Sequence, residues 1–541
     1  MKTKMNIKSL YIVLCGLVLS FASCKDYLTE IEPGTVLLED FFVSTDAAVQ
    51  NVTGCYTPLM WEYNRTYCPE WFIGDIASDD ALKGGGSTTD MADIYDVENW
   101  RTTDQNTFAL DFYQAQYQGI GRCNLALEYI NKMEIGIDSA FTQDMKDRLL
   151  GEVHYLRAYY YFRLVRLFAG VPMTLEVLRS SEDWKMPRAS VDVVFTQILS
   201  DLEQANAKLW LKSEYPEADM GRATKGAAQA MLMKTNLYMA SPYWQKHGLS
   251  KTAAQCYADA KAWGDSIINS GEYDLCPNYE DNFTCAGENG IESVFEIQYA
   301  EVAWGDYGEG FGFTAGSFTQ ILVRSRNSVI GGGWGFNHPT QNLYNEFEAG
   351  DIRRDVAILI PDTSINKDYQ TITEEIYLGN IMLNNKYGMY RDPKDVGGGY
   401  GKWNLHASRG PLNNKQIRYA DVLLMYAEAC LETGDAGTAL TYINKVRSRV
   451  GLPNAPVADN ATLRHERRCE LAMEGHRWFD LVRWEGVDGN GLKAHMDAYK
   501  AQESADVQHH IQEFVAGKHE LLPIPQEERQ LDPQLSQNPG Y

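Results

Sequence analysis

The chain has 541 residues and a formal net charge of −24, from 73 acidic and 49 basic side chains. This acidic balance argues against nucleic acid as a partner and against docking on anionic lipid through a basic patch. Hydrophobic residues make up 44% of the chain, which is enough for a substantial buried core.

The N-terminus has the organisation of a secretory signal. Lysines precede an apolar stretch over residues 10–21, and Ala22 and Ser23 stand directly before Cys24. The apolar stretch is shorter than the roughly 20 residues that a membrane-spanning helix needs, so residues 1–23 are predicted to be a cleaved signal peptide. Cys24 is similar to the cysteine of a bacterial lipobox, whose lipidation would anchor the mature protein outside the cytoplasm. The alternative is an ordinary cleaved signal, since Phe21 is an imperfect lipobox residue.

Helical periodicity predicts a series of helix pairs further along the chain. Apolar residues recur at helical spacing over residues 149–168, 191–211, 224–240, 253–268, 419–430 and 436–450. The first of these stops at Gly170-Val171-Pro172, and Gly434-Asp435 makes the turn between the last two. That last pair resembles half of a tetratricopeptide repeat. One helix pair cannot bury its own apolar face, so several pairs are expected to stack.

Two long regions lack helical periodicity. The first covers residues 61–107 and the second residues 292–411, and both contain runs of glycine. A short strand is predicted over residues 293–299. Loops of this length in a compact protein are usually functional. The predicted fold class is therefore mainly α, a tetratricopeptide-like helical-repeat scaffold with large irregular loop and short-strand insertions.

The cysteines give no metal-binding pattern. Cys123, Cys430 and Cys469 lie within amphipathic helical patterns and are expected to be small buried hydrophobes. Cys276 and Cys285 have a spacing that can close a disulfide loop, but spacing alone does not settle their state.

Enzyme signatures are missing from the sequence. It contains no HExxH, G-x-S-x-G or P-loop motif, and its histidines show no metal-ligand spacing, so neither catalysis nor a cofactor is predicted. The sequence does not decide whether a structural calcium ion occupies an acidic loop. The adjacent carboxylates Asp79 and Asp80 are interpreted as turn-capping groups or acceptors for sugar hydroxyls. A glycosidase using them is the less favoured alternative. The charged residues of segment 463–483 are expected to form structural salt bridges.

Aromatic residues in the two irregular regions are the strongest binding signal. The chain has 12 Trp and 32 Tyr, and several Trp lie in glycine-rich or polar stretches rather than in periodic helices. A flat indole can cover the apolar C–H face of a pyranose ring, while polar neighbours bind the hydroxyl groups. For any single loop tryptophan, filling a local core is the competing interpretation. From position and chemistry, the predicted ligand-binding residues are Asp79, Asp80, Trp100, Trp304, Tyr307 and Trp334.

Several segments together resemble the SusD/RagB family of Bacteroidetes outer-membrane lipoproteins. In chain order they are CKDYL at 24–28, EVHYLRAYYYF at 152–162, RYADVLLMYAEA at 418–429, ERRCELA and GHRWFDL within 466–481, and LPIP and QNPGY within 522–541. The resemblance covers essentially the whole mature sequence. It divides the chain into an N-terminal helical region, 24–290, and a C-terminal region, 291–541, with an insertion-rich binding face.

The resemblance also implies a function. Such proteins are surface-exposed, non-catalytic and glycan-binding, and they cap a SusC-like TonB-dependent transporter of the outer membrane. The family's binding residues lie in its variable loops, so no binding residue carries over. A peptide ligand, as for some RagB-like members, is the alternative within the binding class.

Overall fold

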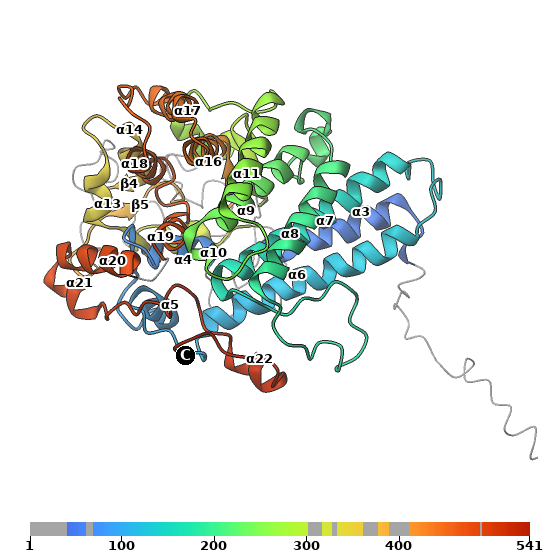
Figure 1. Ribbon diagram of the computed structural model, residues 1–541, viewed down its shortest axis with the longest axis horizontal. Helices are drawn as coiled ribbons and strands as arrows, with labels where there is room; N and C mark the ends of the chain where they lie inside the picture. Colours follow the sequence, from blue (N-terminus) through green and yellow to red (C-terminus); the bar gives the residue numbers. More distant parts are fainter. Residues whose placement is uncertain are drawn as a thin grey trace, which may run out of the picture.

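The fold is mainly helical, which confirms the predicted class. The computed structural model describes residues 41–60, 69–300, 316–326, 333–360, 377–388, 410–486 and 490–541. In Figure 1 the long helices of the first half lie side by side, and the shorter helices and strands of the second half gather at their flank. Within these described ranges, no helix is both long enough and apolar enough to cross a bilayer.

The long helices stack in chain order. They are α3 (Thr45–Tyr56), α6 (Thr107–Lys132), α7 (Gln143–Phe168), α8 (Val191–Lys208), α9 (Lys225–Ala240), α11 (Ala253–Asn269), α16 (Tyr419–Glu432) and α17 (Ala436–Arg449). Each of α6, α7, α8, α9, α11 and α16 packs against the next in this series. All six predicted helices are present, and α3 and α6 are additional to them. This arrangement is compatible with a tetratricopeptide-like scaffold.

Side-chain caps explain where these helices begin. An N-cap oxygen accepts a hydrogen bond from an otherwise unpaired amide of the first turn. The helices α7, α8, α9, α11 and α17 are capped in this way by Thr142, Ser190, Thr224, Thr252 and Asp435. The turn before α17 uses Gly434, whose φ of 83° favours glycine.

The structure also has many shorter helices, and some of them lie in the two regions without helical periodicity. The shorter helices of the protein are α4 (Glu70–Ile76), α5 (Ala92–Glu98), α10 (Pro242–Gln245), α12 (Thr319–Val323), α13 (Gln341–Glu346), α14 (Ile352–Ala357), α18 (Asn460–Glu470), α19 (Arg477–Glu485), α20 (Asn490–Gln502), α21 (Ala505–His510) and α22 (Gln526–Leu531). Short 3-10 turns cover Thr57–Met60, Lys212–Glu214, Glu217–Asp219, Tyr279–Phe283 and Cys285–Gly287. Neither of the two regions is therefore entirely non-helical, since α4 and α5 lie within 61–107 and α12, α13 and α14 lie within 292–411.

The described strands form three two-stranded antiparallel sheets. The strands are β1 (Ala81–Gly84), β2 (Ser293–Ile297), β3 (Phe336–Pro339), β4 (Ile358–Leu359), β5 (Leu383–Asn384) and β6 (Asn414–Arg418). The pairs are β1 with β3, β2 with β6, and β4 with β5. β2 lies within the predicted strand 293–299, and its partner β6 leads directly into α16.

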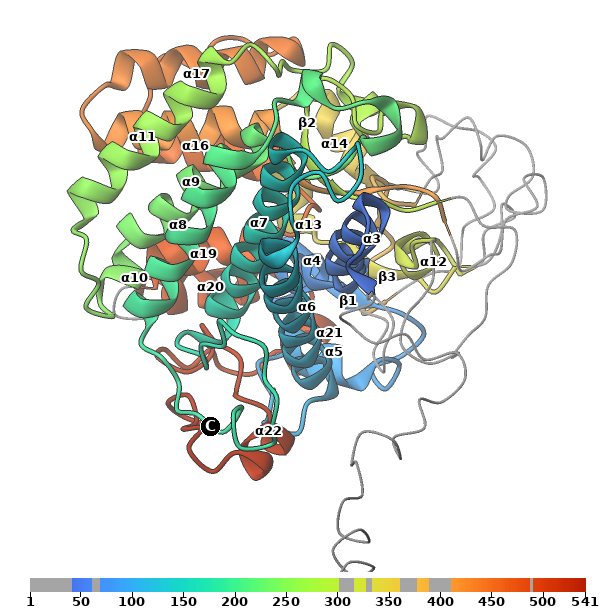
Figure 2. The same cartoon turned by 90° about the vertical axis from the view of Figure 1, so that its right-hand side faces the viewer.

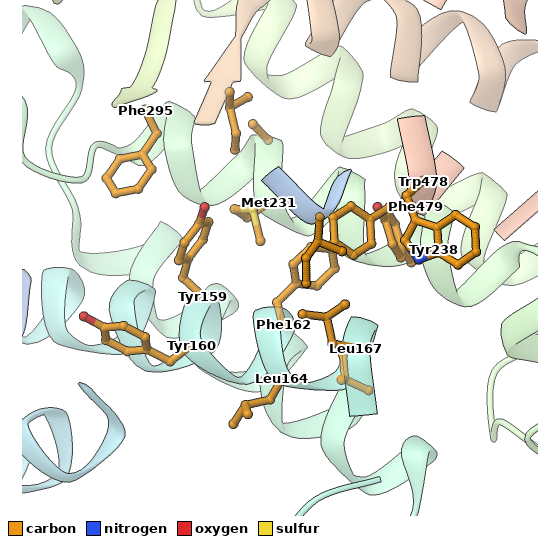
Figure 3. Packing of buried hydrophobic residues seen from close by; sticks show 14 of the residues in the cluster. Tyr159, Tyr160, Phe162, Leu164, Leu167, Met231, Tyr238, Phe295, Trp478 and Phe479 are labelled. Carbon is orange, nitrogen blue, oxygen red and sulfur yellow. The ribbon is translucent and has the colours of Figure 1, made fainter. Parts of the chain in front are cut away.

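The centre of the hydrophobic core is α7. Every residue from Tyr155 to Phe168 is buried, so this part of the helix is enclosed on all sides. Figure 3 shows Tyr159 and Phe162 directed towards side chains from β2, α9 and α19. The ring of Phe162 lies 5.0 Å from that of Tyr238 on α9. One continuous cluster of buried hydrophobic residues contains members of both predicted regions, 24–290 and 291–541.

The charged C-terminal segment forms buried ion pairs, as predicted, but most of them join different elements. Arg467 of α18 pairs with Asp421 of α16 at 2.8 Å, and Arg483 of α19 pairs with Glu428 of α16. The pair between Arg483 and Asp480, at 2.8 Å, is local to one helix. Arginine can contact carboxylates on several elements because its planar head group offers five donors.

None of the cysteines in the described residues forms a disulfide bond. Cys123, Cys430 and Cys469 are buried, which confirms their interpretation as small hydrophobic residues. Cys276 and Cys285 are partly exposed and form no disulfide in this structure.

Candidate functional site

Two glycine-rich segments far apart in the sequence meet beside α12, at the side of the molecule shown in Figure 2. Pairing of β1 with β3 places Gly84 opposite Phe336. The amide of Gly85 then donates to the carbonyl of Gly335 at 2.5 Å. A Cβ atom on Gly84 would lie only 2.4 Å from the same carbonyl oxygen, and its φ is 77°. Glycine is therefore required where these two chains approach.

Lys83 holds the turn that follows β1. Its side chain is fully buried, and its ammonium group donates to the carbonyl oxygens of Gly84 at 2.7 Å, Ser87 at 3.0 Å and Asp90 at 2.6 Å. Burial lowers the pKa of Lys83 to about 8, and burial raises the pKa of the nearby Glu98 carboxyl to about 7. The turn over residues 84–90 is thus fixed from inside the protein.

Trp334 lies beside this turn and is partly exposed. Its ring packs edge-on against Phe318 with 4.9 Å between centroids, and its amide donates to the carbonyl of Ile321 at 2.7 Å. Arg326 donates to the carbonyl of Trp334 at 3.2 Å and also pairs with Asp90 at 3.2 Å. We call Trp334, Arg326 and the turn 84–90 together the Trp334 shelf.

The Trp334 shelf combines an aromatic side chain with exposed polar groups. The ion pair between Arg326 and Asp90 is exposed, and the hydroxyl groups of Ser87 and Thr89 lie 3.1 Å apart at the surface of the same turn. Aromatic rings offer large apolar contact area, whereas the polar groups fix orientation through hydrogen bonds. This arrangement suits a ligand with one apolar face and several hydroxyl groups.

Asp79 and Asp80 do not lie on the Trp334 shelf and are not exposed to a ligand. Both are buried, and Arg468 contacts Asp79 at 3.0 Å and Asp80 at 2.8 Å. Arg477 also contacts Asp79 at 2.7 Å, and His495 contacts it at 2.9 Å. Burial alone would raise the pKa of Asp79, but the two arginines outweigh it and hold the pKa well below its usual range. The pair joins the loop before β1 to α18, α19 and α20.

The other predicted site residues are not brought together either. Trp100 is only 6% exposed and packs edge-on against Phe514 at 5.3 Å, so it fills a local core. Trp304 and Tyr307 lie outside the described residues. Of the six predicted ligand-binding residues, Trp334 is the one that the described part of the structure places at the surface.

The sequence analysis did not predict Lys83 or the polar residues of the Trp334 shelf. Lys83 precedes the glycine run, and a lysine before a turn of glycine and serine residues was the one available signal for it. Arg326 and Asp90 gave no signal, because only the pairing of β1 with β3 brings them together. The described part of the chain contains no group of three or more His, Cys, Asp or Glu side chains able to hold a metal ion.

Comparison with known families covers most of the chain. Residues 291–541 match the SusD family, and residues 26–237 match a family described as starch-binding associating with outer membrane. The two matches are separate and together leave residues 238–290 between them.

Individual relatives agree with these matches. SusD-like protein P25 of Formosa agariphila is 26% identical over 87% of this chain and 89% of its own length. A solved laminarin binding SusD-like protein is 27% identical, with a TM-score of 0.72 over 92% of this chain and 99% of that one. Surface glycan-binding protein A from Bacteroides uniformis is 25% identical, with a TM-score of 0.73 over the same shares. The chain therefore belongs to the SusD/RagB family.

Proposed function

We propose that the protein is a surface-exposed lipoprotein that binds oligo- or polysaccharide, without catalysing a reaction on it, and delivers it to a SusC-like TonB-dependent transporter. The observation that carries the proposal is the full-length likeness, in sequence and fold, to a protein described as a laminarin binding SusD-like protein. The Trp334 shelf supplies a chemically suitable surface in this chain.

The geometry favours modest affinity from several weak contacts. A single partly exposed indole contacts one face of one sugar ring, and the groups around it provide hydrogen bonds that compete with water. The turn 84–90 is already ordered by Lys83, so little conformational freedom is lost on binding. Reversible capture of this kind suits a protein that hands its ligand to a transporter.

Calorimetric titration with a panel of soluble glycans tests the proposal. The panel contains laminarin, starch fragments, and oligosaccharides from cellulose, xylan and mannan, with a peptide library alongside. We expect one glycan class to bind, with no new reducing ends released over the incubation. Binding of peptides alone would favour the RagB-like alternative, and steady release of sugar would make the protein a glycosidase.

Trp334→Ala and Trp334→Phe locate the binding. Losing an aromatic contact costs about 1.5–3 kcal/mol, so Trp334→Ala should weaken binding about tenfold or more. Trp334→Phe keeps an aromatic face and should retain most of the affinity. Equal affinity in all three proteins would remove Trp334 from the site while leaving glycan binding itself in place.

Membrane attachment is tested at Cys24, which lies outside the described residues. Metabolic labelling with an alkyne fatty acid should mark the native protein, and Cys24→Ala should abolish the label and release the protein from the outer-membrane fraction. Retention of both label and location in Cys24→Ala would contradict the lipid anchor. Co-purification of the native protein with a TonB-dependent transporter from detergent extracts tests the partner.

A further inference from the structure

A large cavity lies away from the Trp334 shelf. It is a groove of about 800 Å³ between α6, the loop that follows α7, and the segment around α22. Figures 1 and 2 both show this loop running alongside α6 and close to α22. The groove shares no residue with the Trp334 shelf. Its size is that of ordinary ligand pockets, which have volumes of about 300–1,000 Å³. We call it the α6 groove.

The floor of the α6 groove is a row of residues on one face of α6. Tyr113, Tyr117, Gly121 and Leu125 follow one another at intervals of four, so they share a face of the helix. The rings of Tyr113 and Tyr117 lie 4.8 Å apart. Gly121 is exposed, and a Cβ atom on it would meet no other atom within 4 Å. Tyr113 is buried and Tyr117 is partly exposed, so Tyr117 supplies the aromatic surface of this row, which ends in open space above Gly121.

A polar row lies beside the aromatic row. Gln114, Gln118 and Arg122 are again four residues apart, about 6 Å along the helix axis, and all are partly exposed in the groove. The Gln114 amide donates to the carboxylate of Glu528 at 2.8 Å, which joins α6 to α22. These side chains provide both donors and acceptors next to an aromatic strip.

The loop that forms the opposite wall is held in place. The Asn124 amide donates to the carbonyl oxygens of Thr174 at 2.9 Å and Glu176 at 3.2 Å. At the other end of the loop, the amide of Met186 donates to the buried carboxylate of Asp532 at 2.8 Å. The walls are thus formed before any ligand arrives, which lowers the free-energy cost of binding.

Trp184 also lines the groove, from the loop that follows α7, and is partly exposed. The hydroxyl of Tyr117 donates to the carbonyl of Pro172 at 2.8 Å, so its hydrogen-bonding capacity is directed at the wall while its ring lines the groove. Aromatic surface is therefore available on two sides of the cavity. A ring with apolar C–H faces and hydroxyl groups at its edges matches this lining.

The charges of the lining restrict the ligand further. Among the described lining residues, Glu176, Glu528 and Asp532 face a single basic side chain, Arg122. This excess of carboxylates disfavours acidic sugars by like-charge repulsion. It also disfavours occupation by the chain's own residues 25–40, which carry acidic side chains in excess. Acidic ligands are therefore disfavoured, and the match of the aromatic lining to a sugar ring favours a neutral sugar over a basic ligand.

We propose that the α6 groove is a second carbohydrate-binding site, which takes a neutral oligosaccharide segment. This inference rests on the proposed glycan binding and extends it to a second place on the same molecule. One chain of glycan, or two neighbouring ones, would then be held at two points, which raises the overall avidity without any new contact at the Trp334 shelf.

Gly121→Trp tests the groove. The added indole fills the open space above the floor, and Gly121→Ala is the matched control because a methyl group there meets nothing. With the panel glycan that binds the native protein, we expect calorimetry to give about two sites per molecule on short oligosaccharides and about one in Gly121→Trp. Trp334→Ala should weaken the other site about tenfold or more, and the double variant should keep only that weakened site. Trp184→Ala removes an aromatic side chain from the lining of the α6 groove. It should therefore weaken binding at the site that Gly121→Trp blocks. Circular dichroism checks that each variant folds.

The outcomes separate this inference from the proposed function. Unchanged stoichiometry and affinity in both Gly121→Trp and Trp184→Ala, together with weakened binding in Trp334→Ala, would overturn the second site and keep the first. Loss of a co-purifying membrane protein in Gly121→Trp, with glycan binding intact, would assign the groove to a protein partner instead. Absence of binding to every glycan of the panel would overturn both proposals.

Discussion

Arg418 and Glu474 form a two-point ion pair in the interior, with Nε to Oε2 and Nη2 to Oε1 distances of 2.7 Å each. Both side chains are only 1% exposed. Lys386 also donates to Glu474 at 2.7 Å, and Arg418 reaches Glu470 at 2.9 Å. Burial alone would raise the pKa of Glu474, but Arg418 and Lys386 outweigh it and lower that pKa. The junction of β6, α16 and α18 is therefore held by satisfied charges as well as by apolar contacts.

Glu474→Gln should destabilise the protein by about 3–5 kcal/mol, because it leaves Arg418 and Lys386 without their full counter-charge in a buried place. Glu182→Gln, at an exposed pair with Lys185, is the control and should cost less than about 1 kcal/mol. Urea unfolding at neutral pH measures both. A loss in Glu474→Gln as small as that in the control would show that the buried pair contributes little.

The lowered pKa of Glu474 also fixes a pH dependence. A carboxylate whose pKa is lower in the folded state stabilises the fold above its unfolded pKa, which is about 4, and this contribution is lost as the pH falls. Stability should therefore decline more gently in acid for Glu474→Gln than for the native protein. Parallel curves of unfolding free energy against pH for the two proteins would contradict this.

Lys83→Met should disorder the turn 84–90 while keeping the long helices. The substitution removes the donor from the carbonyls of Gly84, Ser87 and Asp90, and each hydrogen bond to a charged group contributes about 1.5–3 kcal/mol. Proteolysis within the turn should accelerate, and glycan binding at the Trp334 shelf should weaken. Lys132→Met, at an exposed pair on α6, is the control. Native-like binding in Lys83→Met would mean that the turn does not contribute to the site.

The long helices follow from the sequence where apolar residues recur at helical spacing. Periodicity finds α7 in this way, although α7 also buries charged residues such as Glu152 and Arg157. What the sequence does not show is how buried polar residues are paired. Asn124 of α6, for example, donates to the carbonyl of Thr174 in the loop that follows α7, and a single sequence does not reveal such a pairing.

The candidate site was less predictable for a similar reason. From the sequence, Asp79 and Trp334 are equally plausible binding residues, because one is polar, the other is aromatic, and both lie in regions without helical periodicity. Asp79 is buried because Arg468 and Arg477 reach it from helices nearly 400 residues further along the chain. Trp334 stays partly exposed although one edge of its ring packs against Phe318. Long-range contacts, and not composition, decide which of the two faces a ligand.

Gly119→Ala should destabilise the contact between α6 and α7. A Cβ atom on Gly119 would lie 2.4 Å from the ring of Tyr160, and that ring is fixed by a hydrogen bond from its hydroxyl to the carbonyl of Cys55 at 2.6 Å. Overpacking of this kind costs about 1–3 kcal/mol, more than the helix gains from alanine. Gly437→Ala in α17, where the methyl group meets nothing, should instead be neutral or stabilising by about 0.5 kcal/mol. The thermal unfolding temperature should fall in Gly119→Ala and stay unchanged or rise in Gly437→Ala, and equal shifts would contradict the packing argument.

Asp75→Asn should change how stability depends on pH in the direction opposite to Glu474→Gln. Asp75 is fully buried between the amide of Gly475 at 2.9 Å and the side chain of Asn337 at 3.0 Å, and burial raises its pKa to about 8. An unfolded aspartate has a pKa of about 4, so between these values the folded state binds more protons at this site and its stability falls as the pH rises.

The asparagine variant removes that titration. Between about pH 5 and about pH 8, its urea midpoint should fall less than that of the native protein. Asp46→Asn, at an exposed position on α3, is the control and should follow the native curve. A native-like decline in Asp75→Asn would show that the Asp75 carboxyl is already ionised in the folded protein. Its buried charge would then be compensated by its two hydrogen-bond donors and by Lys386, which lowers the pKa of Asp75.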